Sequence, residues 1–410
     1  MSDSCLVRQP VFGGTGSLIA YEIRFHNAED GRDAFAQSFL SGNFDLVRNR
    51  MPAFVTATRE QLVGDAFLVA DPGSVIAMVP RDLVADGELI EALVRFRAAG
   101  GVLALDDARA EASPSEQLLP YMTWARVDAR SADPATINAI CDRLTAHPEG
   151  AGIKLIATNV EELEHYEATL QRGFDGFQGS FFSRPEPLPA ADMPQSTVAA
   201  MRLMGLARDP KIDDQQLEEV LSTDPVLTFQ LLRLVNSAAL GGRGVSSIGQ
   251  ALRLIGRTAF LRWLAVAVAA ARKSKNGVDQ ELVRQAVERG RLLEQLAGRQ
   301  RDPGTLFLVG LFSLMDAVFR MPLHEILERV VLSAEANAAL LDRTGPYADA
   351  ITFAESYELG LFEHATELAR EMGVDPANLG GFYTNAITWT AEALSAVLDS
   401  QEAMAVKKAS

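Results

Sequence analysis

The first half of the chain alternates short β-like runs with helical stretches, and this alternation limits the folds open to it. Residues 6–12 and 18–26 flank the turn sequence GGTGS and predict a β-hairpin. Further β-like runs follow at 66–71, 74–79, 101–108, 124–129 and 152–158. Between the fourth and fifth runs, DGELIEALVRFRAAGG has one apolar helical stripe and two terminal glycines. Strand–helix–strand order predicts parallel strands with right-handed crossovers, in a (β/α) barrel or a doubly wound sheet.

Acidic residues stand where these runs end, and both architectures place their ligand site at that edge. They are Asp71, Asp106, Asp107 and Asp128. Two like charges side by side after an apolar run are unfavourable unless a cation neutralises them. A divalent metal beside Asp106 and Asp107 would do so and would suggest catalysis on a phosphate. For each aspartate alone, a loop-entry or helix-capping role is the alternative.

The pattern changes at SRPEPLPAADMPQS (183–196), whose four prolines exclude a helix and indicate a linker. Beyond it the β-like runs disappear and the stretches show helical periodicity. Asp224–Pro225, for example, is an N-cap and N1 pair that opens a helix with Leu227 and Leu231 on one face. The sequence therefore predicts a barrel domain at 1–187, a proline-rich linker at 188–194 and an all-α domain at 195–410.

Charge and hydropathy exclude several classes of protein. The 410 residues include 38 Lys and Arg against 54 Asp and Glu, a formal charge of −16, which argues against bulk binding of nucleic acid. The most apolar run, WLAVAVAAA, is shorter than the roughly 20 residues that a membrane span needs. The polar start lacks a signal core, and the two cysteines lie far apart. We expect a cytoplasmic protein without membrane insertion.

Fingerprints of common catalytic sites are absent from the sequence. No serine-hydrolase, phosphate-loop or dinucleotide motif occurs. The five histidines are scattered, and none is followed by aspartate. A helical metal-phosphohydrolase site needs several His and Asp ligands, so no metal centre is expected in the second half.

Several motifs together resemble known signalling domains. RQPVF, YEIRF, ALDDA, RVD, NVEE and GFDGFQGSFFSRP resemble, in order and spacing, the EAL family of cyclic di-GMP phosphodiesterases. LSTDPVLTFQLLRLVNSAAL, SSIGQALRLIG and GLFSLMDAVF resemble an HDOD domain. The pair is similar to the EAL–HDOD family of bacterial signalling proteins. This resemblance implies a TIM-like barrel of EAL type with an atypical first strand, here shortened, followed by an all-helical HDOD domain without metal ligands.

The resemblance also assigns site residues. Active EAL enzymes use two metals, held by carboxylates and an asparagine, to activate water. The matching carboxylates here are Glu22, Asp106, Asp107, Asp128 and Glu161. The residues that would contact a nucleotide are Gln9, Arg24, Arg126 and Gln178.

Other family positions have changed. Where the family has an arginine that holds ligand phosphate, this chain has His26, and where the family has the catalytic lysine, it has Arg126. Two glutamates of the family correspond to Met78 and Thr158. The asparagine falls near residues 69–70, at Val69 or Ala70. Methionine offers no carboxylate, and arginine does not readily replace lysine in proton transfer. We therefore expect a remnant site in which Arg126, from the adjacent strand, neutralises the aspartate pair.

These losses predict a non-enzymatic scaffold or regulator related to cyclic di-GMP signalling, whose HDOD domain docks a protein partner. No resident cofactor or metal is expected, and Mg²⁺ enters only if the remnant site is active. The alternatives are a receptor that binds cyclic di-GMP without hydrolysis and a weak phosphodiesterase. Because EAL-type barrels often dimerise, a homodimer is also an expectation of the resemblance.

Overall fold

The chain forms two compact units, one built mainly from residues up to Ser183 and one mainly from Arg184 onward. The structure, a computed structural model, describes residues 5–26, 34–71, 73–109, 111, 113–131, 134–146, 152–183, 195–209, 211–236, 244–271, 276–298, 301–330 and 332–409. The predicted linker at 188–194 and the predicted boundary after 187 lie outside these residues.

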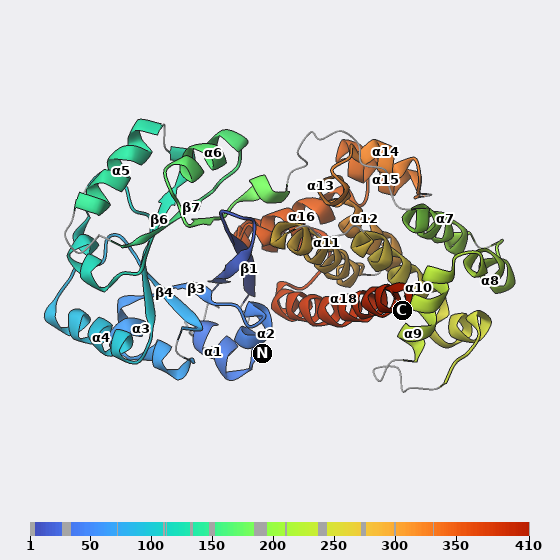
Figure 1. The fold of residues 1–410 in the computed structure, drawn as a ribbon, viewed down its shortest axis with the longest axis horizontal. Coiled ribbons are helices and arrows are strands. Elements are labelled where there is room, and N and C mark those ends of the chain that lie inside the picture. Colours follow the sequence, from blue (N-terminus) through green and yellow to red (C-terminus); the bar gives the residue numbers. More distant parts are fainter. Residues whose placement is uncertain are drawn as a thin grey trace. The chain divides into compact units, whose positions relative to one another are not determined.

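The first unit is a closed barrel whose strands follow one another in sequence order (Figure 1). β1 pairs antiparallel with β2 and with β8, whereas all pairs from β2 to β8 are parallel. This confirms the predicted hairpin and the TIM-like barrel with an atypical first strand. The strands are β1 (Cys5–Gly13), β2 (Leu18–His26), β3 (Ala53–Thr56), β4 (Val75–Val79), β5 (Val102–Leu105), β6 (Trp124–Asp128), β7 (Lys154–Thr158) and β8 (Gly176–Phe177).

One predicted strand is wrong. The run at 66–71 contains a 3₁₀ helix, η1 (Ala66–Val69), in which Phe67 is buried while Val69 is 63% exposed. The third strand is instead β3, and the two-residue β8 is too short to leave a sequence signal. Asp71 consequently lies in the turn before β4, where its carbonyl accepts from Ser74, and not at a strand's carboxyl end.

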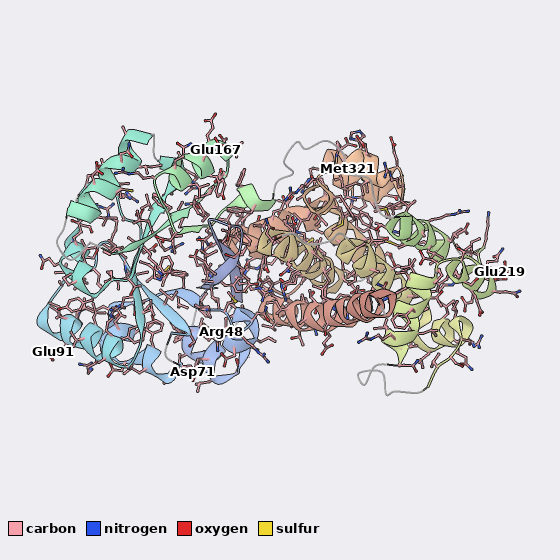
Figure 2. All side chains as sticks on the ribbon, viewed as in Figure 1. Arg48, Asp71, Glu91, Glu167, Glu219 and Met321 are labelled. Atoms are coloured by element: carbon pink, nitrogen blue, oxygen red, sulfur yellow. The ribbon has the colours of Figure 1, made fainter. Side chains whose placement is uncertain are left out.

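Helices surround the barrel. They are α1 (Ala34–Leu40), α2 (Asn43–Arg48), α3 (Arg59–Val63), α4 (Gly87–Ala98), η2 (Pro114–Tyr121), η3 (Ala129–Ser131), α5 (Pro134–Ala146), α6 (Leu163–Gln171) and η5 (Ser180–Ser183). In α4 the N-cap Asp86 accepts from the Leu89 amide. Leu89, Leu93 and Phe96 of the predicted stripe are buried, whereas Val94 is 47% exposed. Exposed side chains such as Glu91 on α4 and Glu167 on α6 face away from the strands (Figure 2).

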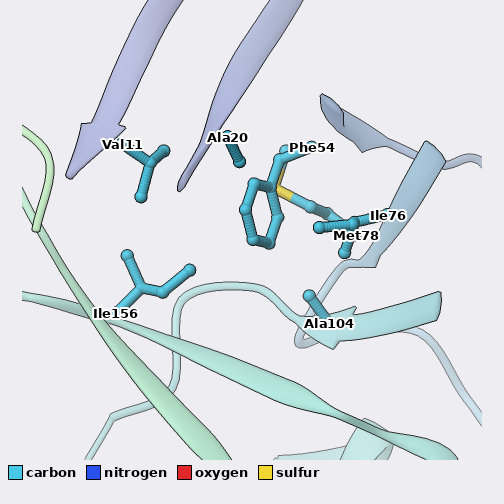
Figure 3. Close-up of a cluster of buried hydrophobic side chains, with 7 residues drawn as sticks. All are labelled: Val11, Ala20, Phe54, Ile76, Met78, Ala104 and Ile156. Atoms are coloured by element: carbon cyan, nitrogen blue, oxygen red, sulfur yellow. The ribbon is translucent and has the colours of Figure 1, made fainter. Parts of the chain in front are cut away.

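The barrel interior is packed with apolar side chains (Figure 3). The buried cluster consists of Val11, Ala20, Phe54, Ile76, Met78, Ala104 and Ile156. Because side chains alternate along a strand, residues two positions further toward the carboxyl end also point inward. The polar residues of the site therefore lie directly above this apolar layer.

The second unit is helical. Its elements are α7 (Gln195–Arg208), α8 (Asp214–Ser222), α9 (Pro225–Val235), α10 (Ile248–Ala270), α11 (Gly277–Gln295), α12 (Pro303–Phe312), α13 (Met315–Phe319), α14 (Leu323–Leu327), α15 (Ala334–Asp342), α16 (Ala348–Glu358), α17 (Phe362–Glu371), η7 (Pro376–Asn378) and α18 (Leu379–Ala409). Asp224 caps α9 through the amides of Val226 and Leu227, as predicted. None of the described helices combines the length and apolarity that a membrane crossing requires.

Candidate functional site

Polar side chains from five parts of the barrel converge above the apolar layer. Glu22 comes from β2, Arg126 from β6, Asp106 from the residue after β5, and Gln178 from the residue after β8. Gln9 on β1 faces Glu22 in the register of the hairpin. The topology thus brings together residues that lie up to 169 positions apart in the sequence.

Arg126 lies at the centre of this group, and its side chain is only 7% exposed. Its Nη2 donates to Glu22 Oε2 at 2.8 Å and to Gln178 Oε1 at 3.0 Å. Its Nη1 donates to Asp106 Oδ1 at 2.9 Å and approaches the Met78 sulfur at 2.7 Å. The planar guanidinium fork therefore joins two carboxylates that come from different strands.

Glu22 is held as a carboxylate by several donors. Arg24 Nε donates to its Oε1 at 3.0 Å, and Gln178 Nε2 donates to its Oε2. Burial alone would raise the pKa of Glu22, but the charges of Arg126 and Arg24 outweigh burial and lower the pKa to about 2. Gln178 also donates to Gln9 Oε1 at 3.0 Å, so both glutamines belong to the same network.

Asp106 and Asp107 are neutralised by different arginines. Arg126 takes Asp106, as predicted, whereas Asp107 pairs with Arg109 at 2.6 Å. Asp107 adopts a positive φ of 52°, and its backbone amide donates to Asp106 Oδ1 at 3.1 Å. Burial raises the pKa of Asp106 despite Arg126, and the charges of Glu22 and Asp107 add to the increase.

The end of β6 carries a second carboxylate group. Asp128 Oδ2 accepts from Arg130 at 3.0 Å and from Asn159 at 2.9 Å. Burial would raise the pKa of Asp128, but these hydrogen bonds lower it. Glu161 lies 3.8 Å from the same arginine and is half-exposed. Both predicted carboxylates therefore lie at this edge of the barrel, bound to a cation of the chain itself.

Arg109 and Arg130 were not predicted from the sequence. A simple spacing could have identified them, because an acid is followed two residues later by arginine at three places: Glu22–Arg24 within β2, Asp107–Arg109 after β5 and Asp128–Arg130 at the end of β6. Each pair forms a salt bridge. Glu22 and Arg24 lie on the extended strand β2, where residues two positions apart share a face. The other two pairs form where the chain leaves a strand, at the positive φ of Asp107 and in η3.

The structure also places the positions that differ from the EAL pattern. Met78 is fully buried on β4 and contacts Arg126, and Thr158 on β7 donates to the Val127 carbonyl at 3.3 Å. The predicted correspondence of the asparagine to Val69 or Ala70 is wrong, because neither lies on a strand. The residue at the carboxyl end of the third strand is Thr56.

The residues as arranged do not fit a divalent metal. Glu22 and Asp106 are both bound to Arg126, and Met78 offers a thioether where Mg²⁺ prefers oxygen. Among the residues that the structure describes, no three or more His, Cys, Asp or Glu side chains gather in a way that could hold a metal.

Comparison with known proteins extends this description. Residues 193–343 match the family model of the HDOD domain. Cyclic di-GMP phosphodiesterase CdgJ of Vibrio cholerae is 24% identical over 397 residues, which span 92% of this chain and 89% of the relative. The chain has the EAL–HDOD architecture. The uncharacterized protein YuxH of Bacillus subtilis is likewise 24% identical, over 94% of this chain and 97% of its own.

Two solved structures are similar to about half of the chain. Klebsiella pneumoniae BlrP1, in a calcium and cyclic di-GMP complex, is 23% identical with a TM-score of 0.38, covering 44% of this chain and 55% of that one. Bacillus subtilis YkuI, with an EAL domain and in complex with cyclic di-GMP and calcium, is 13% identical with a TM-score of 0.38, covering 54% and 74%.

The comparisons correct one prediction. The expectation that the chain is not an enzyme is contradicted by the Vibrio relative, which aligns over nearly the whole chain and is named as a phosphodiesterase. The expectation rested on the changed positions Met78, Arg126 and Thr158. Such changes, taken from sequence alone, do not establish an inactive barrel.

Proposed function

We propose that the protein acts in cyclic di-GMP signalling and that its barrel binds cyclic di-GMP at the carboxyl ends of the strands. The observation that carries the proposal is the gathering of arginines and glutamines at this edge. Cyclic di-GMP presents two phosphodiester groups, and arginine binds phosphate oxygens through two parallel hydrogen bonds. The name of the Vibrio relative supports the choice of this nucleotide.

Three of these arginines are accessible to a ligand. The exposed fractions of the side chains are 37% for Arg24, 59% for Arg109 and 53% for Arg130. The pairs of Arg109 and Arg130 are partly exposed, and such pairs contribute only about 0–1 kcal/mol, so a phosphate can displace their carboxylate partners at small cost. Arg24 keeps its pair with Glu22, which is only 5% exposed. We assign phosphate contacts to these three residues. Gln9 and Gln178 are assigned to orient the nucleotide.

Hydrolysis of the bound nucleotide is the second candidate function, and the name of the Vibrio relative favours it. The carboxylates for such chemistry would be Glu22, Asp106, Asp107, Asp128 and Glu161. In the present arrangement Arg126 holds Glu22 and Asp106, so hydrolysis requires that this guanidinium move.

Binding of the nucleotide has to be passed on to another protein, and we assign this step to the HDOD domain. This domain offers no motif for chemistry in its sequence, so we propose that it docks a protein partner. We further propose, from the resemblance to EAL-type barrels, that two copies of the chain form a homodimer through the barrel. Sedimentation of the full chain with and without cyclic di-GMP measures the oligomeric state, and a monomer in both conditions would refute the homodimer.

Calorimetric titration of the full chain with cyclic di-GMP, followed by chromatography of the recovered nucleotide, tests the proposal. We expect saturable binding, weakened about tenfold or more in Arg24→Gln, because a charge-assisted phosphate contact contributes about 1.5–3 kcal/mol. Arg95→Gln is the control, since it also removes a partly exposed arginine from an ion pair, with Asp65, but lies on the outer helix α4. Linear dinucleotide in the recovered material would establish hydrolysis. Absence of binding would refute the proposal.

A further inference from the structure

We infer that Arg126 takes the place of a divalent cation, so that binding of an anionic ligand at this barrel does not depend on metal. The inference deepens the proposed function and rests on it for the identity of the ligand. Its starting point is the disagreement between the EAL pattern, which uses two metals, and the arrangement of Glu22, Asp106 and Arg126.

The first step of the argument is geometric. A guanidinium nitrogen lies within 2.9 Å of a carboxylate oxygen on each side, from Glu22 and from Asp106. These oxygens would be the ligands of a cation at this point. Because Arg126 is almost completely buried, a metal could reach both carboxylates only if the guanidinium left the barrel interior.

The second step concerns what holds Arg126 in place. Gln178 accepts from Nη2 through its carbonyl oxygen and donates to Glu22 and Gln9 through its amide, which fixes the amide's orientation. Met78 lies against Nη1 with its sulfur. A glutamate at position 78 would add a third carboxylate and favour a divalent ion, whereas the thioether adds none.

The third step is the charge of the whole edge. The carboxylates that remain at the surface have their own cations, Asp107 with Arg109 and Asp128 with Arg130. The five carboxylates predicted from the sequence thus face four arginines: Arg24, Arg109, Arg126 and Arg130. A phosphodiester approaching this edge meets a nearly neutral surface without any metal, because the chain supplies the cations.

Direct metal binding is the first test and needs no nucleotide. Mn²⁺ is titrated into the full chain, and free Mn²⁺ is followed by electron paramagnetic resonance. We expect no saturable site up to millimolar Mn²⁺. Saturable binding that disappears in Glu22→Gln would overturn the inference, because it would show that Glu22 holds a metal and not Arg126.

Nucleotide affinity is the second test. Cyclic di-GMP is titrated into the full chain in EDTA and again in MgCl₂, and we expect the same Kd in both. Affinity that falls tenfold or more in EDTA would overturn the inference while leaving the proposed function intact. If no nucleotide binds in either buffer, the proposed function fails, and the Mn²⁺ titration alone decides the inference.

A double variant tests the converse, namely whether metal binding can be restored. Met78→Glu combined with Arg126→Lys restores the two residue types that the EAL pattern has at these positions. We expect this variant to gain a saturable Mn²⁺ site and a rise in melting temperature with Mn²⁺. Arg130→Lys is the matched control, since it changes an exposed arginine at the same edge and leaves Arg126 in place. A gain of Mn²⁺ binding in the control would count against the inference.

Discussion

Arg126 and Glu22, 104 residues apart in the sequence, form a buried ion pair of 2.8 Å between Nη2 and Oε2 inside the barrel. β6 and β2 are not neighbours in the sheet, so the pair spans the interior. Removing one partner of a buried pair leaves an uncompensated charge, which costs far more than an exposed pair contributes. The stability of the barrel should therefore depend on Arg126.

Arg126→Met should lower the free energy of unfolding of the barrel by about 3–5 kcal/mol, because Glu22 and Asp106 lose their shared cation. Scanning calorimetry of the full chain measures the transition, and hydrogen exchange of the β5–β7 amides assigns it to the barrel. Arg95→Gln, which breaks an exposed pair, should cost at most about 1 kcal/mol. Equal effects of the two variants would contradict the central position of Arg126.

The free energy of unfolding should depend on pH through the ionisation of Glu22. Its pKa is about 2 in the folded chain against 4.5 in the reference state, so the unfolded chain binds more protons between these values. The stabilisation is complete above about pH 4.5 and is lost as the pH falls toward 2, by about 3 kcal/mol in all. Acid unfolding of Glu22→Gln should show a correspondingly flatter profile.

Asp106 provides a control of opposite sign. Its pKa is raised by burial, so its contribution to stability is present at low pH and is lost as the pH rises through the raised pKa. Asp106→Asn should therefore make the loss of stability on acidification steeper, whereas Glu22→Gln makes it shallower. Parallel changes in the two variants would contradict the assigned pKa directions.

Gly179→Ala should distort the site through the backbone. A Cβ at this position would overlap the backbone nitrogen and carbonyl of Val160, whose amide donates to the Gln178 carbonyl at 2.9 Å. We expect a loss of about 1–3 kcal/mol in stability, with weaker binding of cyclic di-GMP because Gln178 shifts. Gly87→Ala is the control, because a Cβ there would meet no atom within 4 Å and φ is not positive. Calorimetric unfolding and ligand titration compare the two.

Gly310→Ala tests the packing of the helical unit. Here α12 lies so close to α11 that a Cβ would come within 2.7 Å of the Arg289 carbonyl and 2.8 Å of Gly290 Cα. Overpacking of this kind should cost about 1–3 kcal/mol. Gly381→Ala in α18 meets no atom within 4 Å and should be neutral or stabilising by up to about 1 kcal/mol. Thermal unfolding of the helical unit distinguishes these outcomes.

The sequence predicted most of the barrel because its apolar β-like runs alternate with helical signals. The hairpin, α4 with its cap and the N-terminus of α9 all follow from local patterns. The prediction of a strand at 66–71 is wrong because a short apolar run does not by itself distinguish a strand from a helical turn. Whether such a run pairs in a sheet depends on the adjacent strands. β8 was missed since two residues give no periodicity. β3 was also missed, although β5, of the same four-residue length, was predicted.

The sequence by itself determined which charged residues stand at the strand ends and that adjacent acids there need cations. Only the tertiary structure decided which cation each acid receives. Asp106 and Asp107 are neighbours in the chain, yet one pairs with the buried Arg126 and the other with the exposed Arg109. The physical reason is that a closed barrel brings the ends of distant strands within hydrogen-bonding range. Because these contacts are buried, they, and not the spacing in the sequence, decide which arginine neutralises which carboxylate.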